Sequence, residues 1–221
     1  MPYTYQYPHP AVTVDACLFT ILDEQLKILL IRRALEPFKD DWALPGGFIR
    51  MDENLEAALQ RELEEETGAT GFYFEQLETF GQVDRDPRER VISVAYFALA
   101  PAEHVVLKAD TDASDAAWHA VDELPDLAFD HASIINRAVK RVRAKAEYST
   151  VAFEFLPPEF TISDVRQVYE TVQGVAIDKR NFQKWLNGRN LIEPTGEKRT
   201  GSHRPAELFR LKATKRRIAF A

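Results

Sequence analysis

Residues 46–69, GGFIRMDENLEAALQRELEEETGA, combine a helical pattern with a high density of acids. Asn54 is a favourable N-cap and Gly68 a favourable stop, so the sequence predicts a helix between them. The apolar residues of this helix recur at helical spacing and define one buried face. The stretch also carries seven carboxylates: Asp52, Glu53, Glu56, Glu62, Glu64, Glu65 and Glu66.

Three of these carboxylates fall on the apolar side of the predicted helix. At about 100° per residue, Glu62, Glu65 and Glu66 share the buried face, whereas Glu56 and Glu64 point to solvent. Carboxylates that are turned inward lose hydration and repel one another, so they stay ionised only beside a cation. We therefore predict a site for a hard divalent cation here, in preference to an ordinary solvated acidic helix.

The composition of the chain fits an intracellular protein. Its 221 residues allow one large domain or two modest ones. The single cysteine, Cys17, excludes an internal disulfide and suits a reducing compartment. The N-terminus lacks the pattern of a signal peptide, and no run approaches the ~18 apolar residues of a membrane span. We expect a soluble, cytoplasmic protein with no membrane partner.

The charges divide the chain into two parts. Residues 1–147 carry 15 Lys and Arg against 27 Asp and Glu, whereas residues 148–221 carry 13 against 8. An acidic part followed by a basic part suggests two domains with different partners. Pro157 and Pro158 cannot continue a helix and mark the joint. We predict domains at 1–147 and 148–221.

The first part has an α/β pattern. Residues 11–22 and 26–33 are rich in β-branched and apolar residues and predict two strands joined by a turn at 23–25. The acidic helix follows them. Three more strand-like runs and a helical pattern come next, at 72–83, 90–100, 115–121 and 130–148. Strands around one central helix, with another helix at the end, predict an α/β sandwich.

The acidic stretch resembles the Nudix box at every defined position. The matching residues are Gly47, Glu53 after five residues, Arg61-Glu62-Leu63 after seven more, and then Glu65-Glu66, Gly68 and Ala69. This resemblance implies an α/β/α sandwich that binds a nucleoside diphosphate linked to another moiety. It also implies that Mg²⁺ or Mn²⁺ is held by Glu62, Glu65, Glu66 and the backbone carbonyl of Gly47. Arg61 would brace these carboxylates, and Glu53 would lie close to the site.

A metal at this site could neutralise a diphosphate and activate a water for attack on phosphorus. One carboxylate must then act as the general base. Glu66, Glu62 or an acid from the loop 108–115 could do this, and the sequence does not choose among them. Metal binding without turnover is the alternative.

Three arginines, Arg85, Arg88 and Arg90, stand just ahead of the strand-like run at 90–100. Their guanidinium groups could clamp phosphate or ribose. The alternative is that they pair with neighbouring acids in a surface turn. The stretch resembles the matching region of ADP-ribose-recognising Nudix proteins that carry a DNA-binding tail, which implies ADP-ribose as the ligand.

The second part has a helix-turn-helix pattern. Residues 160–174 and 178–190 predict two helices joined by a short turn at Gly174. The outward face of the second helix has the residue types that read major-groove edges and phosphates. These residues are Lys179, Arg180, Gln183, Lys184 and Asn187. Two strand-like runs then flank a turn with Lys198, Arg199 and Arg204, which predicts a basic wing, and a basic tail follows at 215–217. The alternative is a dimerisation module that this basic helix merely solubilises.

The two parts together resemble the Nudix-related transcriptional regulators of bacterial NAD metabolism. That resemblance implies a homodimer that binds a double-stranded DNA operator and releases it when ADP-ribose occupies the Nudix domain. Many such regulators have eroded boxes, but the box here is complete, which favours retained metal-dependent hydrolysis. We therefore predict an ADP-ribose-binding Nudix domain fused to a DNA-binding winged helix, acting as a repressor. The alternative is a plain ADP-ribose pyrophosphatase whose second domain serves dimerisation.

Overall fold

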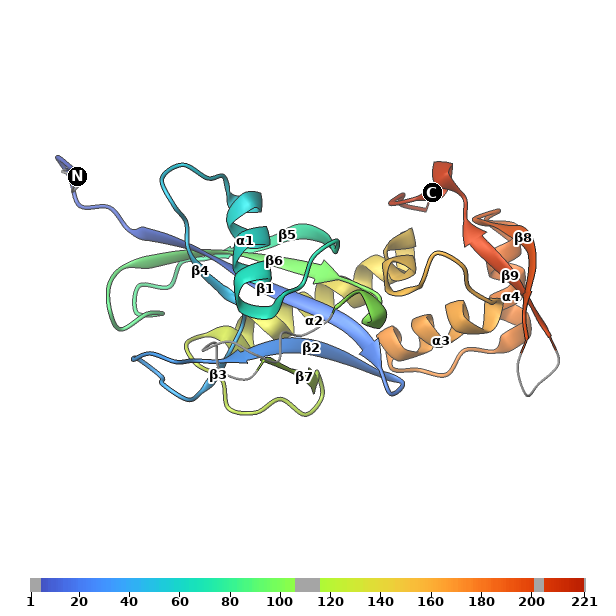
Figure 1. Ribbon diagram of the computed structural model, residues 1–221, viewed down its shortest axis with the longest axis horizontal. Helices are drawn as coiled ribbons and strands as arrows, with labels where there is room; N and C mark the ends of the chain where they lie inside the picture. Colours follow the sequence, from blue (N-terminus) through green and yellow to red (C-terminus); the bar gives the residue numbers. More distant parts are fainter. Residues whose placement is uncertain (1–4, 106–115, 201–204, 221) are drawn as a thin grey trace.

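The computed structural model describes residues 5–105, 116–200 and 205–220. A mixed β-sheet with a helix on each face forms the larger part, and a smaller helical part with a two-stranded sheet follows (Figure 1). The strands of the large sheet are β1 (Ala11–Leu22), β2 (Gln25–Arg32), β3 (Trp42–Ala43), β4 (Gly46–Phe48), β5 (Tyr73–Phe80), β6 (Val91–Leu99) and β7 (Ala116–Ala120). This arrangement confirms the predicted α/β/α sandwich.

Strand β1 is central to the sheet. It pairs parallel with β6 and antiparallel with β2 and β4, and the strand order is β3-β2-β1-β6-β5. The predicted turn into β2 is present, with Asp23 and Glu24 at φ values of 52° and 62°, as a tight hairpin turn requires. Strand β7 adds to the outer side of β2. Since side chains alternate along β1, its two faces supply two separate cores.

Helix α1 (Leu55–Thr67) covers one face of the sheet. Asn54 caps it through its side chain, and Gly68 ends it in the left-handed conformation, as predicted. Its buried residues pack with the even-numbered residues of β1. Glu56 and Glu64 are exposed, as helical phase predicts.

Helix α2 (His131–Tyr148) covers the other face, and its core continues beyond the sheet. Val142 and Ala146 belong to the same buried cluster as Cys17 of β1, Phe153 of the 3-10 helix η2 (Thr150–Phe155) and Val172 in the second part. The two parts therefore share one hydrophobic core. The boundary between residues 147 and 148 stays a prediction.

The second part has the expected helix-turn-helix and wing. Its elements are helices α3 (Ile162–Gln173) and α4 (Lys179–Gly188), followed by strands β8 (Ile192–Arg199) and β9 (Ala206–Leu211). Thr161 caps α3 in a capping box, Gly174 ends it, and Asp178 caps α4. Two shorter 3-10 helices, η1 (Ala102–His104) and η3 (Ala213–Lys215), complete the elements.

Strands β3 and β4 were not predicted, because two or three residues are too few to show strand periodicity. Strand β4 nevertheless matters most for the site, since it carries the first residues of the acidic motif into the sheet. None of the helices in the described parts of the chain is long and apolar enough to cross a lipid bilayer.

Candidate functional site

Two glycines let β4 lie close to both β1 and α1. Gly46 and Gly47 pair with Asp15 and Val14 across the β1–β4 ladder. A Cβ added at Gly46 would lie 2.2 Å from the carbonyl oxygen of Val14, and one at Gly47 would lie 2.4 Å from Glu62 Oε1. Larger residues would therefore push β4 away from the strand or from the acidic helix.

Arg61 holds three carboxylates of the motif in place. Its Nε and Nη2 donate to Glu53 at 2.9 and 2.6 Å, and its Nη1 donates to Glu62 at 2.7 Å and to Glu65 at 3.1 Å. Hydrogen bonding to Arg61 lowers the pKa of Glu53 to about 2. A single guanidinium thus orients three carboxylates through charge-assisted hydrogen bonds.

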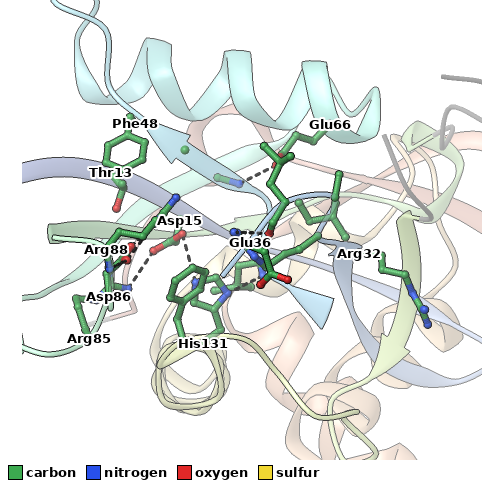
Figure 2. A pocket seen from close by; sticks show the side chains of 18 residues that line it. Thr13, Asp15, Arg32, Glu36, Phe48, Glu66, Arg85, Asp86, Arg88 and His131 are labelled. Atoms are coloured by element: carbon green, nitrogen blue, oxygen red, sulfur yellow. Dashed lines mark hydrogen bonds and ion pairs between the residues drawn. The ribbon is translucent and has the colours of Figure 1, made fainter. Parts of the chain in front are cut away.

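Glu66 extends into a cavity from the end of α1 (Figure 2). The backbone N–H of Gly46 donates to its Oε2 at 2.8 Å. Burial raises the pKa of Glu66 to about 8, with help from the negative charges of Glu62 and Asp15, although the Gly46 bond and Arg33 oppose this shift. A cation would stabilise the ionised form, and carboxylate oxygens are the ligands that hard divalent cations prefer.

The inward placement predicted for Glu65 is wrong. Its side chain is 52% exposed and pairs with Arg61 at 3.1 Å and Arg50 at 3.3 Å. Within the described ranges, no three acidic, histidine or cysteine side chains already converge on a metal-sized site. Glu62 and Glu66 do point inward, so two of the three predicted carboxylates fit a hard cation as they stand. The role of Glu65 as a ligand stays a prediction.

The cavity beside these acids has a volume of 330 Å³, within the usual range for small-molecule sites. Strands β1, β2 and β4, the loop before β6 and the start of α2 enclose it (Figure 2). Its charged lining residues are Asp15, Arg32, Arg33, Glu36, Glu66, Arg85, Asp86 and Arg88. Carboxylates that suit a cation thus stand next to guanidinium groups that suit phosphate.

A buried ion network ties the cavity to α2. Arg85 donates to the two carboxylate oxygens of Asp130 at 2.6 and 3.0 Å and lies 3.5 Å from Asp15. His131 accepts a hydrogen bond from the Leu44 N–H at 2.9 Å, and burial lowers its pKa, which keeps it neutral. Asp130 and His131 lie at the start of α2, so the network connects the cavity to that helix.

Two residues of this network, Asp15 and His131, were not predicted from the sequence. A signal for Asp15 exists, because Thr13 and Asp15 are polar, two residues apart, and therefore on one face of a mostly apolar strand. No pattern could have found His131, since it meets Asp15 only after the sheet has formed.

The three arginines ahead of β6 have different surroundings. Arg85 is buried in the network, with 4% of its side chain exposed. Arg88 lines the cavity and donates to Asp86 at 3.0 and 2.7 Å. Arg90 donates to the backbone carbonyls of Gly81 and Gln82 and lies outside the cavity lining. Their roles in ligand binding stay predictions, and Arg88 has the geometry that suits one best.

Helix α4 presents the polar face that was expected. Phe182 and Leu186 are buried against the core, whereas the opposite side of the helix is open to solvent. The exposed residues on that side include Lys179, Arg180, Gln183, Lys184 and Asn187.

The wing and the tail differ from each other. Lys198 is exposed, and Arg199 is half-exposed while pairing with Asp164 at 2.9 Å. Arg204 and the loop 108–115 lie outside the described residues. The expected basic tail is not free, because Arg216 and Arg217 pair with Glu154 of η2 at 3.5 and 3.2 Å.

Comparison with known proteins agrees with this architecture. Residues 11–138 match the NUDIX domain model, and residues 152–211 match the model of the NrtR DNA-binding winged helix domain. The chain is 35% identical over 208 residues to the ADPR-responsive transcriptional repressor NtrR of Acinetobacter baylyi, covering 92% of this chain and 83% of that protein. It is 43% identical over 129 residues to an ADP-ribose pyrophosphatase of Methanocaldococcus jannaschii, covering 58% of this chain and 73% of that protein.

A solved structure resembles the whole molecule. The crystal structure of Shewanella oneidensis NrtR complexed with a 27mer DNA superposes with a TM-score of 0.84 at 39% identity, covering 95% of this chain and 97% of that one. Fold and acidic site together define a Nudix protein. The chain belongs to the Nudix family, and to the group in which an NrtR-type winged helix follows the Nudix domain.

The buried carboxyl of Glu66 predicts a pH-dependent stability. Its pKa is about 8 in the folded protein against 4.5 ordinarily, so the folded state holds the proton more tightly and loses stability as pH rises through 8. Without metal, the melting temperature of Glu66→Gln relative to that of the parent should increase as pH rises from 5 to 8.5. Differential scanning calorimetry measures this, with the exposed Glu56→Gln as control. A difference in melting temperature between Glu66→Gln and the parent that does not change with pH would contradict the burial of an ionisable carboxyl here. In a separate measurement, added Mn²⁺ should raise the melting temperature of the parent more than that of Glu66→Gln.

Proposed function

We infer that this protein is an ADP-ribose-responsive transcriptional repressor that binds double-stranded DNA through its winged helix. The observation that carries the inference is the single hydrophobic core shared by the Nudix domain and an NrtR-type winged helix, in a chain that matches a repressor over 92% of its length. The relatives supply the ligand class, since one is an ADPR-responsive repressor and another an ADP-ribose pyrophosphatase. Such a repressor acts in the cytoplasm.

The exposed side of α4 supports the DNA contact. Arg180 and Lys184 can donate to phosphates or to guanine edges, and Gln183 and Asn187 can pair with adenine. Strand β8, which follows α4 in the chain and forms part of the wing, adds the positive charge of Lys198. The similar structure with a 27mer DNA has the same two-part fold.

The ligand site supports ADP-ribose or a related nucleoside diphosphate. Its two inward carboxylates, Glu62 and Glu66, would hold Mg²⁺ or Mn²⁺, with Glu65 and the Gly47 carbonyl as further ligands. The phosphates would then lie between this cation and the arginines of the cavity. Arg88 is the arginine best placed to meet them.

We expect the chain to form a homodimer in which bound ADP-ribose rotates the two winged helices, and this rotation would link the ligand site to the DNA-binding face. Two reading helices of a dimer must lie about 34 Å apart to enter successive major grooves, so a small reorientation spoils the fit. Helix α2 begins at the ligand cavity and packs against α3, which gives the ligand a route to the winged helix.

Hydrolysis of the ligand is a second candidate function, and the complete acidic motif supports it. Water would attack one phosphorus of ADP-ribose and break the diphosphate bond, giving AMP and ribose 5-phosphate. A bound divalent cation supplies charge neutralisation of the diphosphate. Glu53 and Glu62 are fixed by Arg61, and Glu66, which lines the cavity and would be ionised beside a bound cation, could take the proton of the water.

Removing two charges from the α4 face tests DNA binding. Arg180→Ala combined with Lys184→Ala should weaken binding to the DNA upstream of the protein's own gene by at least tenfold, because each lost contact is worth about 1–3 kcal/mol. The salt dependence of binding should also become shallower. Gel-shift titration measures both effects. The matched control is Lys39→Ala with Lys140→Ala, two exposed lysines of the Nudix domain; equal losses in the two double variants would contradict a specific reading face.

Coupling between the sites gives a reciprocal prediction. ADP-ribose should weaken DNA binding by about 5–150-fold, and the DNA should weaken ADP-ribose binding by the same factor. Isothermal titration calorimetry of ADP-ribose with and without the DNA measures this, with Ca²⁺ to limit turnover. Equal ADP-ribose affinities in the two titrations would leave the Nudix site without a regulatory role.

Hydrolysis is tested separately with Mg²⁺ or Mn²⁺ and ADP-ribose. Glu66→Gln should lower the rate of AMP release by at least a hundredfold, within the usual contribution of an acid–base group, while Glu56→Gln should keep the parent's rate. Release of AMP is followed by chromatography. Full turnover in Glu66→Gln would contradict the role given to this carboxyl, and an inactive parent would leave the repressor function alone.

A further inference from the structure

An exposed aromatic ring lies at the mouth of the ligand cavity. Phe48 follows the two glycines of β4, lines the cavity and keeps 41% of its surface exposed. Its partner across the β1–β4 ladder is Thr13. Residues directly opposite in an antiparallel pair point to the same face, so the ring and the Thr13 side chain enter the cavity together (Figure 2).

A fixed planar cation lies against this ring. The Arg88 guanidinium carbon is 5.4 Å from the centre of the Phe48 ring and 5.6 Å from that of Phe129. Two hydrogen bonds to Asp86 hold the guanidinium in this orientation. Arg33 lies over Phe129 at 4.7 Å, so planar aromatic and guanidinium groups alternate along one wall. Heterocyclic bases stack on surfaces of this kind.

The same wall offers an unused hydrogen-bonding group. Thr13 is 8% exposed, and its hydroxyl has no hydrogen-bond partner in the described part of the chain. A buried hydroxyl without a partner is unfavourable, and it can both donate and accept. A ligand atom that pairs with it would remove this penalty.

The position of the wall fits one end of a nucleoside diphosphate. Phe48 comes directly after Gly47, which abuts Glu62, and Gly46 binds Glu66. Phosphates bound at these acids through a cation would therefore have their nucleoside within reach of the ring.

We propose that Phe48, backed by Arg88, is the stacking platform for the base of the bound nucleotide, and that the Thr13 hydroxyl hydrogen-bonds to this nucleoside. The platform makes the site select a nucleotide over a sugar phosphate that lacks a base. The proposal rests on the proposed function, in that the ligand is a nucleoside diphosphate such as ADP-ribose.

The test compares variants of the full chain by calorimetry with ADP-ribose in Ca²⁺. Phe48→Ala should weaken ADP-ribose binding by about 5- to 150-fold, the range for loss of base stacking, and Phe48→Trp should restore it. Thr13→Val, which keeps the shape and removes the hydroxyl, should also weaken binding. Tyr148→Ala removes a half-exposed ring at the far end of α2 and should match the parent.

Two further readouts separate a platform from a structural role. Phe48→Ala should keep the parent's Mn²⁺ affinity and melting temperature. AMP should displace ADP-ribose from the parent at lower concentration than ribose 5-phosphate, and Phe48→Ala should reduce that difference, leaving only the part due to Thr13. If Phe48→Ala binds ADP-ribose within twofold of the parent's affinity, or loses Mn²⁺ affinity in parallel, the stacking proposal is wrong while the proposed function stands. A parent that binds no ADP-ribose would overturn both.

Discussion

The apolar face of α2 is buried against two surfaces at once, and the arrangement of the molecule depends on this. Toward its start the helix packs on the sheet, and toward its end Ala146 lies in the same cluster as η2 and α3. A helix of this length spans about 27 Å, enough to join the ligand cavity to the winged helix. Separating the two parts would expose apolar surface on both, so the winged helix has a defined position relative to the cavity.

A second attachment limits how the winged helix can move. Arg143 of α2 donates to the Val172 carbonyl at 3.0 Å, and Gln167 of α3 donates to Glu24 in the β1–β2 turn at 3.1 Å. Strand β1 carries Thr13 and Asp15 at its other end, beside the cavity. Helix α2, which touches α3, and strand β1, which runs into the turn that Gln167 contacts, therefore also line the ligand site. A displacement of either one is transmitted through packed, hydrogen-bonded structure, which is what a two-state coupling needs.

The ligand site itself depends on charges that are only partly balanced. Arg61 pairs with Glu53, Glu62 and Glu65, whereas Glu66 is buried with Glu62 and Asp15 nearby and has its pKa raised. A cation is therefore most favourable beside Glu66, while Arg61 keeps the other three acids in position. The ion pair with Asp86 holds the Arg88 guanidinium against the rings of Phe48 and Phe129.

The sequence alone determined the longer helices and strands and the acidic motif, because caps, helical phase and strand alternation are local properties. Asn54 and Gly68 marked the two ends of α1, Gly174 marked the end of α3, and residue 178 marked the start of α4. Helical phase failed for Glu65, because ion pairs to Arg61 and Arg50 hold that long side chain outward. Only the tertiary structure could bring Asp15, Arg85, Asp130 and His131 together or set Phe48 beside Thr13, since these contacts join residues distant in sequence through the sheet register. It also decided that two parts of opposite charge share one core, because charge counts say nothing about which apolar faces meet.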